Sequence, residues 1–299
     1  MKRIVPGGCK IIQCIEECLN MKKISRRSFL AAAGVAAAAL ALTACGSSAS
    51  STASSAASSA ASSEAASTSA AAGELTTVEA GKLTMATNAA FPPYEMTTDA
   101  GEFEGIDIET AQAIADKLGL ELQIDDMDFD AALLSVQQGK ADIVMAGVTV
   151  TDERKAVMDF SDSYATGIQS IIVPEGSDIA SPDDLAGKKI GTQRGTTGYI
   201  YCSDDFGDEN VVAYDDGLTA VQALNNGQVD AVVIDNAPAQ EFVAANPGLV
   251  ILDTSYAEED YAIGMAKGSA LEDAVNGALE ELKADGTLQA IVDKYITAE

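Results

Sequence analysis

From residue 82 onward, short apolar runs alternate with longer stretches in which apolar residues recur at helical spacing. Residues 105–118, for example, place Ile, Ala and Leu three or four positions apart and stop at Gly119. The expected strands are 82–87, 120–124 and 142–146, and the expected helices are 105–118 and 129–138. This alternation predicts an α/β fold of parallel sheets joined by crossover helices.

The same arrangement recurs 88 residues later in the chain. Residues 137–145 (QQGKADIVM) are similar to residues 225–233 (NNGQVDAVV), and each reads as a helix end, a glycine, a turn and a buried strand. A Gly-Lys pair precedes a strand at 81–82 and again at 187–188. These matches predict two similar α/β lobes. A chance similarity between common helix–glycine–strand units is the alternative.

Two further passages are expected to connect the lobes. Residues 168–173 resemble a strand that ends before Pro174, and the chain returns through residues 260–265. Strands that pass between lobes absorb the rotation when a cleft closes, so we interpret both passages as hinge strands. The predicted domains are a first lobe, 74–172 with 258–299, and a second lobe, 173–257.

Polar side chains follow the expected strands of both lobes. Open α/β sheets bind ligands at the carboxyl ends of their strands, and in the register of the repeat Gly147 corresponds to Asp235. Facing strand ends would place Phe91, Gly147, Thr149 and Arg154 opposite Thr196, Thr197 and Asp235. An anion site, a carboxylate and an aromatic wall would suit the carboxylate, ammonium and side chain of a free amino acid.

The stretch 146–164 contains a short helix with a charge in an unusual place. Thr151 or Asp152 can cap this helix, and acidic residues suit its first turn. Arg154 does not suit it, because a cation there meets the positive end of the helix dipole. Free backbone N–H groups beside an arginine favour a bound carboxylate. The alternative is a surface arginine paired with Asp152 or Glu153.

The net charge, the absence of histidine and the positions of the cysteines exclude several classes of function. The net charge is −28, and beyond residue 45 the body has 11 basic against 44 acidic residues, so we predict no nucleic-acid partner. The chain has no His, which excludes His triads and His metal sites, and we expect neither a metal nor a cofactor. Four of the five Cys lie in the first 45 residues, which leaves Cys202 as an expected small, partly buried residue without a disulfide partner.

The first 73 residues resemble an export signal followed by a tether. A basic start at Met21 precedes the apolar run 29–42, as in a signal peptide, with twin-arginine and Sec export both possible. Leu-Thr-Ala-Cys at 42–45 resembles a bacterial lipobox. We therefore predict a signal peptide with an upstream segment over 1–45, a true start at Met21, and lipidation of Cys45. Residues 46–73, almost entirely Ser and Ala, are expected to be a flexible linker.

Residues 82–299 resemble a type II periplasmic binding protein of the polar amino acid class, the capture subunit of ABC importers. Seven segments in order carry the resemblance: FPPYE at 91–95, GIDI at 105–108, MDF at 127–129, AGVTVTDER at 146–154, DFS at 159–161, GTTG at 195–198 and DGT at 285–287. The resemblance implies a two-lobed α/β fold in which each lobe is a mostly parallel sheet with flanking helices, joined by two hinge strands.

The resemblance also implies roles for the polar residues of the site. Arg154 would hold the α-carboxylate of the ligand bidentately, helped by Thr149 and by Thr197 or its backbone N–H. Asp235 would take the α-ammonium together with the Gly147 carbonyl.

Phe91 and Phe129 would sandwich the ligand side chain, although the sequence pattern alone favours core packing for both. Asp107, Asp142 and Asp230 are expected to be structural, because nothing in the pattern brings them to the cleft.

Two neutral amides bear on specificity. Relatives selective for cationic amino acids often carry an acid where this chain has Asn88, and glutamine-binding relatives carry a Lys near Gln193. We therefore expect a neutral polar ligand. The full predicted site is Asn88, Phe91, Phe129, Ala146, Gly147, Thr149, Arg154, Gln193, Thr196, Thr197 and Asp235.

The function implied by the resemblance is capture without chemistry. The chain would be a monomeric, extracytoplasmic substrate-binding lipoprotein of an ABC importer, anchored to the cell membrane through Cys45 and docking on permease subunits. Two alternatives remain open. One is an enzyme on the same fold, such as a cyclohexadienyl dehydratase, for which Glu95 is the one nearby acid considered. The other is a sensor whose closed form signals to a receptor.

Overall fold

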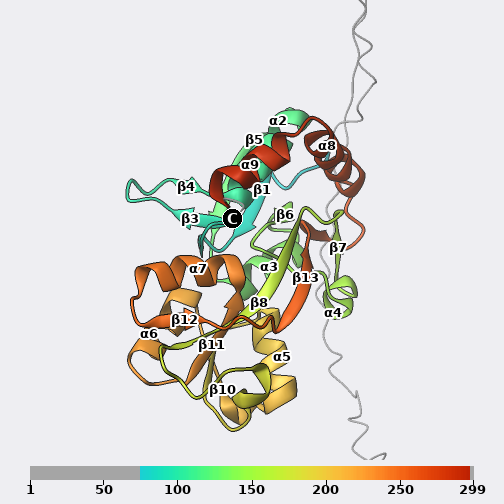
Figure 1. The fold of residues 1–299 in the computed structure, drawn as a ribbon. Coiled ribbons are helices and arrows are strands. Elements are labelled where there is room, and N and C mark those ends of the chain that lie inside the picture. The colour runs from blue at the N-terminus through green and yellow to red at the C-terminus, as the bar shows by residue number, and fades with distance from the viewer. Residues whose placement is uncertain (1–74, 297–299) are drawn as a thin grey trace, which may run out of the picture. The chain divides into compact units, whose positions relative to one another are not determined.

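The computed structural model describes residues 75–296 (Figure 1). The predicted signal peptide, the Ser/Ala-rich linker and Cys45 lie outside the described residues. Between residues 75 and 296, no helix is long and apolar enough to span a bilayer.

The strands form two larger sheets and a small one. The first sheet has the strand order β5-β1-β6-β14-β7, and the second has the order β10-β9-β11-β8-β12 with β13 paired to β8. The first-sheet strands are β1 (Lys82–Thr87), β5 (Glu121–Asp126), β6 (Ile143–Val144), β7 (Met158–Phe160) and β14 (Gly264–Ala266). The second-sheet strands are β8 (Ala165–Pro174), β9 (Ile190–Gln193), β10 (Val211–Tyr214), β11 (Ala231–Asp235), β12 (Leu249–Ile251) and β13 (Ala257–Tyr261). The small sheet contains β2 (Ala90–Phe91), β3 (Glu95–Thr97) and β4 (Phe103–Glu104).

Eight α-helices within the described residues connect and cover these strands (Figure 1). They are α2 (Ile106–Leu118), α3 (Phe129–Gln137), α4 (Asp152–Lys155), α5 (Thr197–Phe206), α6 (Gly217–Asn225), α7 (Asn236–Ala245), α8 (Glu272–Ala284) and α9 (Thr287–Tyr295). Two short 3₁₀ helices cover Pro182–Leu185 and Asp208–Asn210.

The two-lobed α/β architecture is confirmed, but the sheets are mixed rather than mostly parallel. The pairs β1–β5 and β1–β6 are parallel, as are β9–β10 and β9–β11. The pairs made by β14 and by β8 are antiparallel. The reason is topological: parallel neighbours need a crossover helix, whereas β7, β8, β13 and β14 belong to segments that pass directly from one sheet to the other.

The strand expected at 142–146 contracts to two residues in β6. Ile143 and Val144 pair with β1 on one side and with β14 on the other. The chain then turns at Gly147, which has φ +54 and donates its N–H to the Asp107 carboxylate at 3.0 Å. A left-handed backbone of this kind ends a ladder and suits glycine, so the turn shortens the strand.

Two adjacent crossings join the sheets. One lies within the expected passage 260–265, but the expected passage 168–173 is the interior of β8 in the second sheet and is not a crossing. Residues 161–164 lead from β7 into β8, and residues 262–263 lead from β13 into β14. The crossings are tied by backbone hydrogen bonds from Tyr164 N to Tyr261 O at 3.0 Å and from Ser161 N to Ile263 O at 2.9 Å. The predicted lobe limits at 172–173 and 257–258 stay a prediction, although β8 and β13 pair with the second sheet along their whole length.

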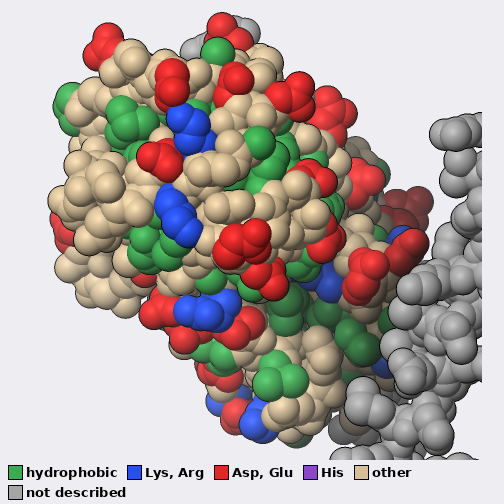
Figure 2. All heavy atoms as spheres, turned by 90° about the horizontal axis from the view of Figure 1, so that it is seen from below, with side chains coloured by type: hydrophobic (Ala, Val, Ile, Leu, Met, Phe, Trp, Pro, Cys, Tyr) green, Lys and Arg blue, Asp and Glu red, His purple; other side chains and the backbone are tan. Residues whose placement is uncertain are grey.

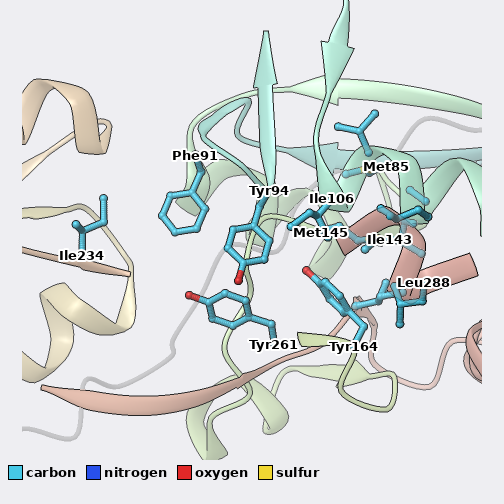
Figure 3. Close-up of a cluster of buried hydrophobic side chains, with 14 of the residues drawn as sticks. Met85, Phe91, Tyr94, Ile106, Ile143, Met145, Tyr164, Ile234, Tyr261 and Leu288 are labelled. Atoms are coloured by element: carbon cyan, nitrogen blue, oxygen red, sulfur yellow. The ribbon is translucent and has the colours of Figure 1, made fainter. Parts of the chain in front are cut away.

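Aromatic rings connect the two cores. Figure 3 shows the rings of Phe91, Tyr94 and Tyr261 between Ile234 of β11 and the aliphatic side chains of the first sheet. Phe91 stacks on Tyr94 with centroids 5.8 Å apart, and Tyr94 meets Tyr261 edge-on at 5.5 Å. Cys202, expected to be partly buried, is fully buried in a separate second-sheet cluster. Burial raises the pKa of its thiol to about 12.

The surface charge is dispersed on the face drawn in Figure 2. Acidic side chains lie across this face with Lys and Arg side chains between them (Figure 2). Ion pairs such as Lys188–Asp178 at 3.0 Å are exposed, and pairs of this kind contribute at most about 1 kcal/mol each. The fold therefore depends on its apolar cores and backbone ladders.

The close approach of β8 to Tyr261 gives a stability prediction. A Cβ on Gly167 would lie 2.4 Å from Tyr261 Cζ, and Tyr261 is a fully buried ring. We expect Gly167→Ala to lower the free energy of unfolding by about 1–3 kcal/mol, because the core must absorb the overlap. Chemical denaturation measures this change.

A matched control is Gly277→Ala in α8. A Cβ there would meet nothing within 4 Å, so the variant should keep or gain stability by up to about 1 kcal/mol through helix propensity. Equal unfolding midpoints for the two variants would contradict the proposed overlap.

Candidate functional site

One cavity of about 430 Å³ is lined by residues from both larger sheets and their loops. All eleven residues predicted from the sequence line this cavity: Asn88, Phe91, Phe129, Ala146, Gly147, Thr149, Arg154, Gln193, Thr196, Thr197 and Asp235. Five further residues complete its wall: Glu95, Gln169, Val233, Ile234 and Tyr261.

Arg154 lies at one end of the cavity on the one-turn helix α4. Thr151 caps this helix, with its Oγ1 accepting from the Arg154 N–H at 3.2 Å. The guanidinium donates from Nη1 to the Thr149 carbonyl at 2.8 Å and from Nη2 to the Gly195 carbonyl at 3.2 Å. It also lies over the Phe129 ring, 5.5 Å from the centroid. Contacts from both lobes therefore hold one cation.

Arg154 is buried, and among residues 75–296 no carboxylate lies within 4 Å of its nitrogens. The alternative of a surface arginine paired with Asp152 or Glu153 is therefore wrong. Burial lowers the pKa of the guanidinium, and the negative charge of Glu259 opposes this shift. A buried cation whose direct contacts are carbonyl oxygens and a ring, with no carboxylate at ion-pair distance, favours an incoming anion.

Hydroxyl groups border the arginine. Thr149 Oγ1 donates to Glu259 Oε2 at 3.1 Å and lies 3.3 Å from Thr197 Oγ1 of the second lobe. Gln169 Nε2 also donates to Glu259 Oε2, at 2.9 Å. Thr197 begins helix α5, where backbone N–H groups without intrahelical partners add to the anion-binding character.

Asp235 supplies the opposite charge in the same cavity. It ends β11 and caps α7, so its carboxylate accepts from Ile168 N at 2.7 Å and from Ala237 N at 3.1 Å. Burial nevertheless raises its pKa to about 6, against the lowering effect of hydrogen bonds from Ile168, Tyr261 and Ala237. A ligand cation beside this carboxylate would relieve the cost of burying its charge.

Two amides meet across the cavity. Gln193 Nε2 donates to Asn88 Oδ1 at 2.8 Å, and Asn88 Nδ2 donates to the Met127 carbonyl at 3.0 Å. Gln193 comes from the end of β9 and Asn88 from the loop after β1, so this bond links the two lobes directly.

The two phenylalanine rings of the cavity lining also pack in or against the hydrophobic core. Phe129 belongs to a buried cluster of the first lobe and also lines the cavity. Phe91 packs against Tyr94 and also lines the cavity, and Figure 3 shows its ring directed away from the aliphatic cluster. A Cβ on Gly147 would lie 2.9 Å from Phe91 Cε1, so glycine also keeps room for this ring.

The five lining residues that the sequence pattern missed have different origins. Gln169 and Tyr261 lie on the strands interpreted only as hinges. Val233 shares a face of β11 with Asp235, since side chains alternate along a strand, and this period could have identified it. Glu95 was considered only as a catalytic acid, and no signal in the sequence separates Ile234 from a core residue.

Known proteins place the chain in a family. A model of bacterial extracellular solute-binding proteins, family 3, matches residues 83–298. The L-cystine-binding protein TcyJ of Escherichia coli (strain K12) is 34% identical over 226 residues, covering 74% of this chain and 85% of that protein.

Two solved structures are similar in sequence and fold. One is the arginine-, lysine-, histidine-binding protein ArtJ from Geobacillus stearothermophilus, with a TM-score of 0.70 and 34% identity over 73% of this chain and 96% of that one. The other is an ancestral arginine-binding protein bound to glutamine, with a TM-score of 0.70 and 42% identity over 73% of this chain and 99% of that one. This chain therefore belongs to the bacterial extracellular solute-binding proteins of family 3.

Proposed function

We propose that this chain is the substrate-binding subunit of an ABC importer and that it captures a free amino acid in the cavity between its lobes. The observation that supports this most is the presence of two buried, opposite charges in the lining of one cavity, Arg154 and Asp235. The α-carboxylate would bind Arg154, Thr149 and Thr197, and the α-ammonium would bind Asp235 and the Gly147 carbonyl. A zwitterion would satisfy both charges at once.

Capture needs no covalent step. The contacts Thr149–Thr197, Arg154–Gly195 and Asn88–Gln193 join the lobes. A ligand that bridges the same groups would shift the population towards the closed form. The named relatives are binding proteins, and no observation favours the dehydratase alternative. A sensor would use the same capture step.

The remaining parts of the proposal rest on the sequence. Lipidation at Cys45 would anchor the chain on the extracytoplasmic face of the cell membrane, and the linker 46–73 would let the binding body reach the permease. We also propose that it acts as a monomer.

For the ligand side chain we propose a neutral polar group. Asn88 and Gln193 offer amide donors and acceptors at the cavity wall and carry no charge. A second candidate is a cationic side chain, which Glu95 favours because it is a fully buried carboxyl in the lining of the same cavity. The similar structures include an arginine-, lysine-, histidine-binding protein and an ancestral arginine-binding protein bound to glutamine.

A calorimetric panel separates these candidates. We expect glutamine, asparagine or serine to bind the purified protein more tightly at pH 7 than arginine, lysine or histidine. Tighter binding of a cationic amino acid would favour the second candidate. If no amino acid binds at millimolar concentration, the proposed function is wrong.

Arg154→Ala should weaken amino acid binding by roughly 100-fold or more, because the ligand carboxylate would remain buried without its cation at a cost of about 3–5 kcal/mol. Titration calorimetry with the tightest ligand measures the loss. The matched control is Arg194→Ala, since Arg194 is half exposed and reaches Asp215 only at 3.5 Å. Equal losses in both variants would argue against the specific role of Arg154.

Asp235 gives a pH prediction. Its pKa is about 6 in the fold and 3.8 ordinarily, so the fold binds this proton more tightly than the unfolded chain does. The stabilisation is complete below pH 3.8 and is lost as pH rises through 6. The free energy of unfolding of the unliganded protein should therefore fall as the pH rises from 3.8 to about 6 and level off above that, as followed by denaturant titration at each pH.

Asp235→Asn should flatten this slope, because other buried acids contribute equally in both proteins. Saturating amino acid should flatten it too, since the ligand ammonium stabilises the ionised form. Identical slopes for the wild type and Asp235→Asn would refute the assignment.

A further inference from the structure

Glu95 has a buried carboxyl group that receives no hydrogen bond from the part of the chain that the structure describes. It begins β3, is fully buried and lines the cavity. Within the described residues, no N–H or O–H of another residue donates to either of its oxygens. Asp107 lies beside it, because the backbone N–H of Asp107 donates to the Tyr94 carbonyl at 2.8 Å, and each of the two carboxyl groups shifts the pKa of the other. Two carboxyl groups can hydrogen-bond only if one of them carries a proton.

Asp107 is the ionised member of the pair. It lies in the first turn of α2, fully buried, and does not line the cavity. Its Oδ1 accepts from the Tyr164 hydroxyl at 2.7 Å and its Oδ2 accepts from the Gly147 N–H at 3.0 Å. Two donors stabilise a carboxylate, whereas Glu95 has none, so the shared proton lies on Glu95.

The pKa directions agree with this geometry. Burial raises the pKa of Glu95 well above its usual range, and the charge of Asp107 adds to the shift. Burial also raises the pKa of Asp107 to about 6, but its hydrogen bonds from Tyr164 and Gly147 oppose that rise. Both directions agree with one proton on Glu95 and one negative charge on Asp107.

Among residues 75–296, the surroundings of the pair supply no cation to replace this proton. The titratable groups near the pair are Asp126, whose charge raises the pKa of Glu95 further, and the phenols of Tyr94 and Tyr164. Asp235 also acts on Tyr94. Arg154 lines the same cavity, but within the described residues it makes no ion pair with Glu95. A positive charge that stabilises ionised Glu95 must therefore come from the ligand.

Building on the proposed amino acid capture, we propose that Glu95 and Asp107 share one proton in the unliganded site. This proton leaves when a ligand with a cationic side chain binds, and it stays when the side chain is neutral. In the first case the Glu95 O–H bond breaks, the electron pair stays on the carboxylate, the proton passes to buffer, and the ligand cation balances the new charge. In the second case the Glu95 hydroxyl donates to the ligand or to Asp107.

Glu95 is thus a specificity-determining residue, and Asp107 is a positioning residue that acts through it. The choice between cationic and neutral ligands becomes dependent on pH. Affinity for a cationic side chain should rise with pH, by up to about tenfold per unit for one coupled proton, whereas affinity for a neutral side chain should not.

The test is titration calorimetry of the full-length protein with arginine and with glutamine at pH 6.5, 7.5 and 8.5, in buffers of different ionisation enthalpy. We expect arginine to release up to about one proton more per site than glutamine, because any release from Asp235 is common to both ligands. Arginine affinity should rise with pH relative to glutamine affinity.

Two variants and a control complete the test. Glu95→Gln should remove the difference in proton release between the ligands and weaken arginine binding. Asp107→Asn should reduce the release, because Glu95 loses its negative neighbour and ionises more readily before binding. Glu104→Gln on the adjacent strand β4 removes an exposed carboxylate and should behave as the wild type. Unfolding midpoints establish that each variant is folded.

The outcomes separate the two proposals. Equal proton release for arginine and glutamine overturns the shared-proton inference and leaves amino acid capture intact. Failure of arginine to bind at pH 8.5, while glutamine binds, also overturns it. If the wild type binds neither ligand nor any other amino acid, the proposed function fails and the inference fails with it.

Discussion

The burial of Arg154 without a paired carboxylate is the constraint on which the arrangement of the site depends. Removing a guanidinium from water costs several kcal/mol even after local relaxation. The fold offsets part of this cost with carbonyl oxygens from Thr149 in one lobe and Gly195 in the other, and with the face of Phe129. Because these groups belong to different sheets, the cation helps to set the distance between the lobes.

The same principle describes the remainder of the cavity. Asp235 is a buried carboxylate with backbone donors but no cation, and Glu95 is a buried carboxyl that keeps a proton in place of a donor. The free-energy cost of burying each of these groups is reduced by hydrogen bonds or by a bound proton. The three together form an incomplete charge pattern. A zwitterionic ligand supplies the opposite charges for Arg154 and Asp235. The charge of the ligand side chain determines whether Glu95 keeps its proton.

The sequence could predict the site residues that are marked by a local signal, such as an internal repeat, the end of a strand or a charge at a helix start. The internal repeat aligned Gly147 with Asp235, and the rule that ligands bind at strand ends brought Phe91, Thr149 and Thr197 to the same cavity. The dipole argument at Arg154 identified a misplaced cation, and its burial supports that interpretation.

The parts that sequence reasoning missed depend on long-range geometry. Gln169 and Tyr261 reach the cavity because β8 and β13 pair antiparallel at the crossing between lobes, and no local pattern specifies that register. The carboxyl pair of Glu95 and Asp107 was missed because Asp107 reads as an ordinary acid in the first turn of a helix. The antiparallel pairings were missed because helix–strand alternation predicts only the parallel ones.

The hydrogen bond between Gln193 and Asn88 has a consequence for the strength of capture. The bond joins a strand end of the second lobe to a loop of the first, so the two amides satisfy each other across the cavity. A ligand that needs either amide must first break this bond, and only the surplus contributes to its affinity. The pair therefore lowers the affinity for such a ligand. In a carrier protein, re-forming the bond would favour release of the ligand.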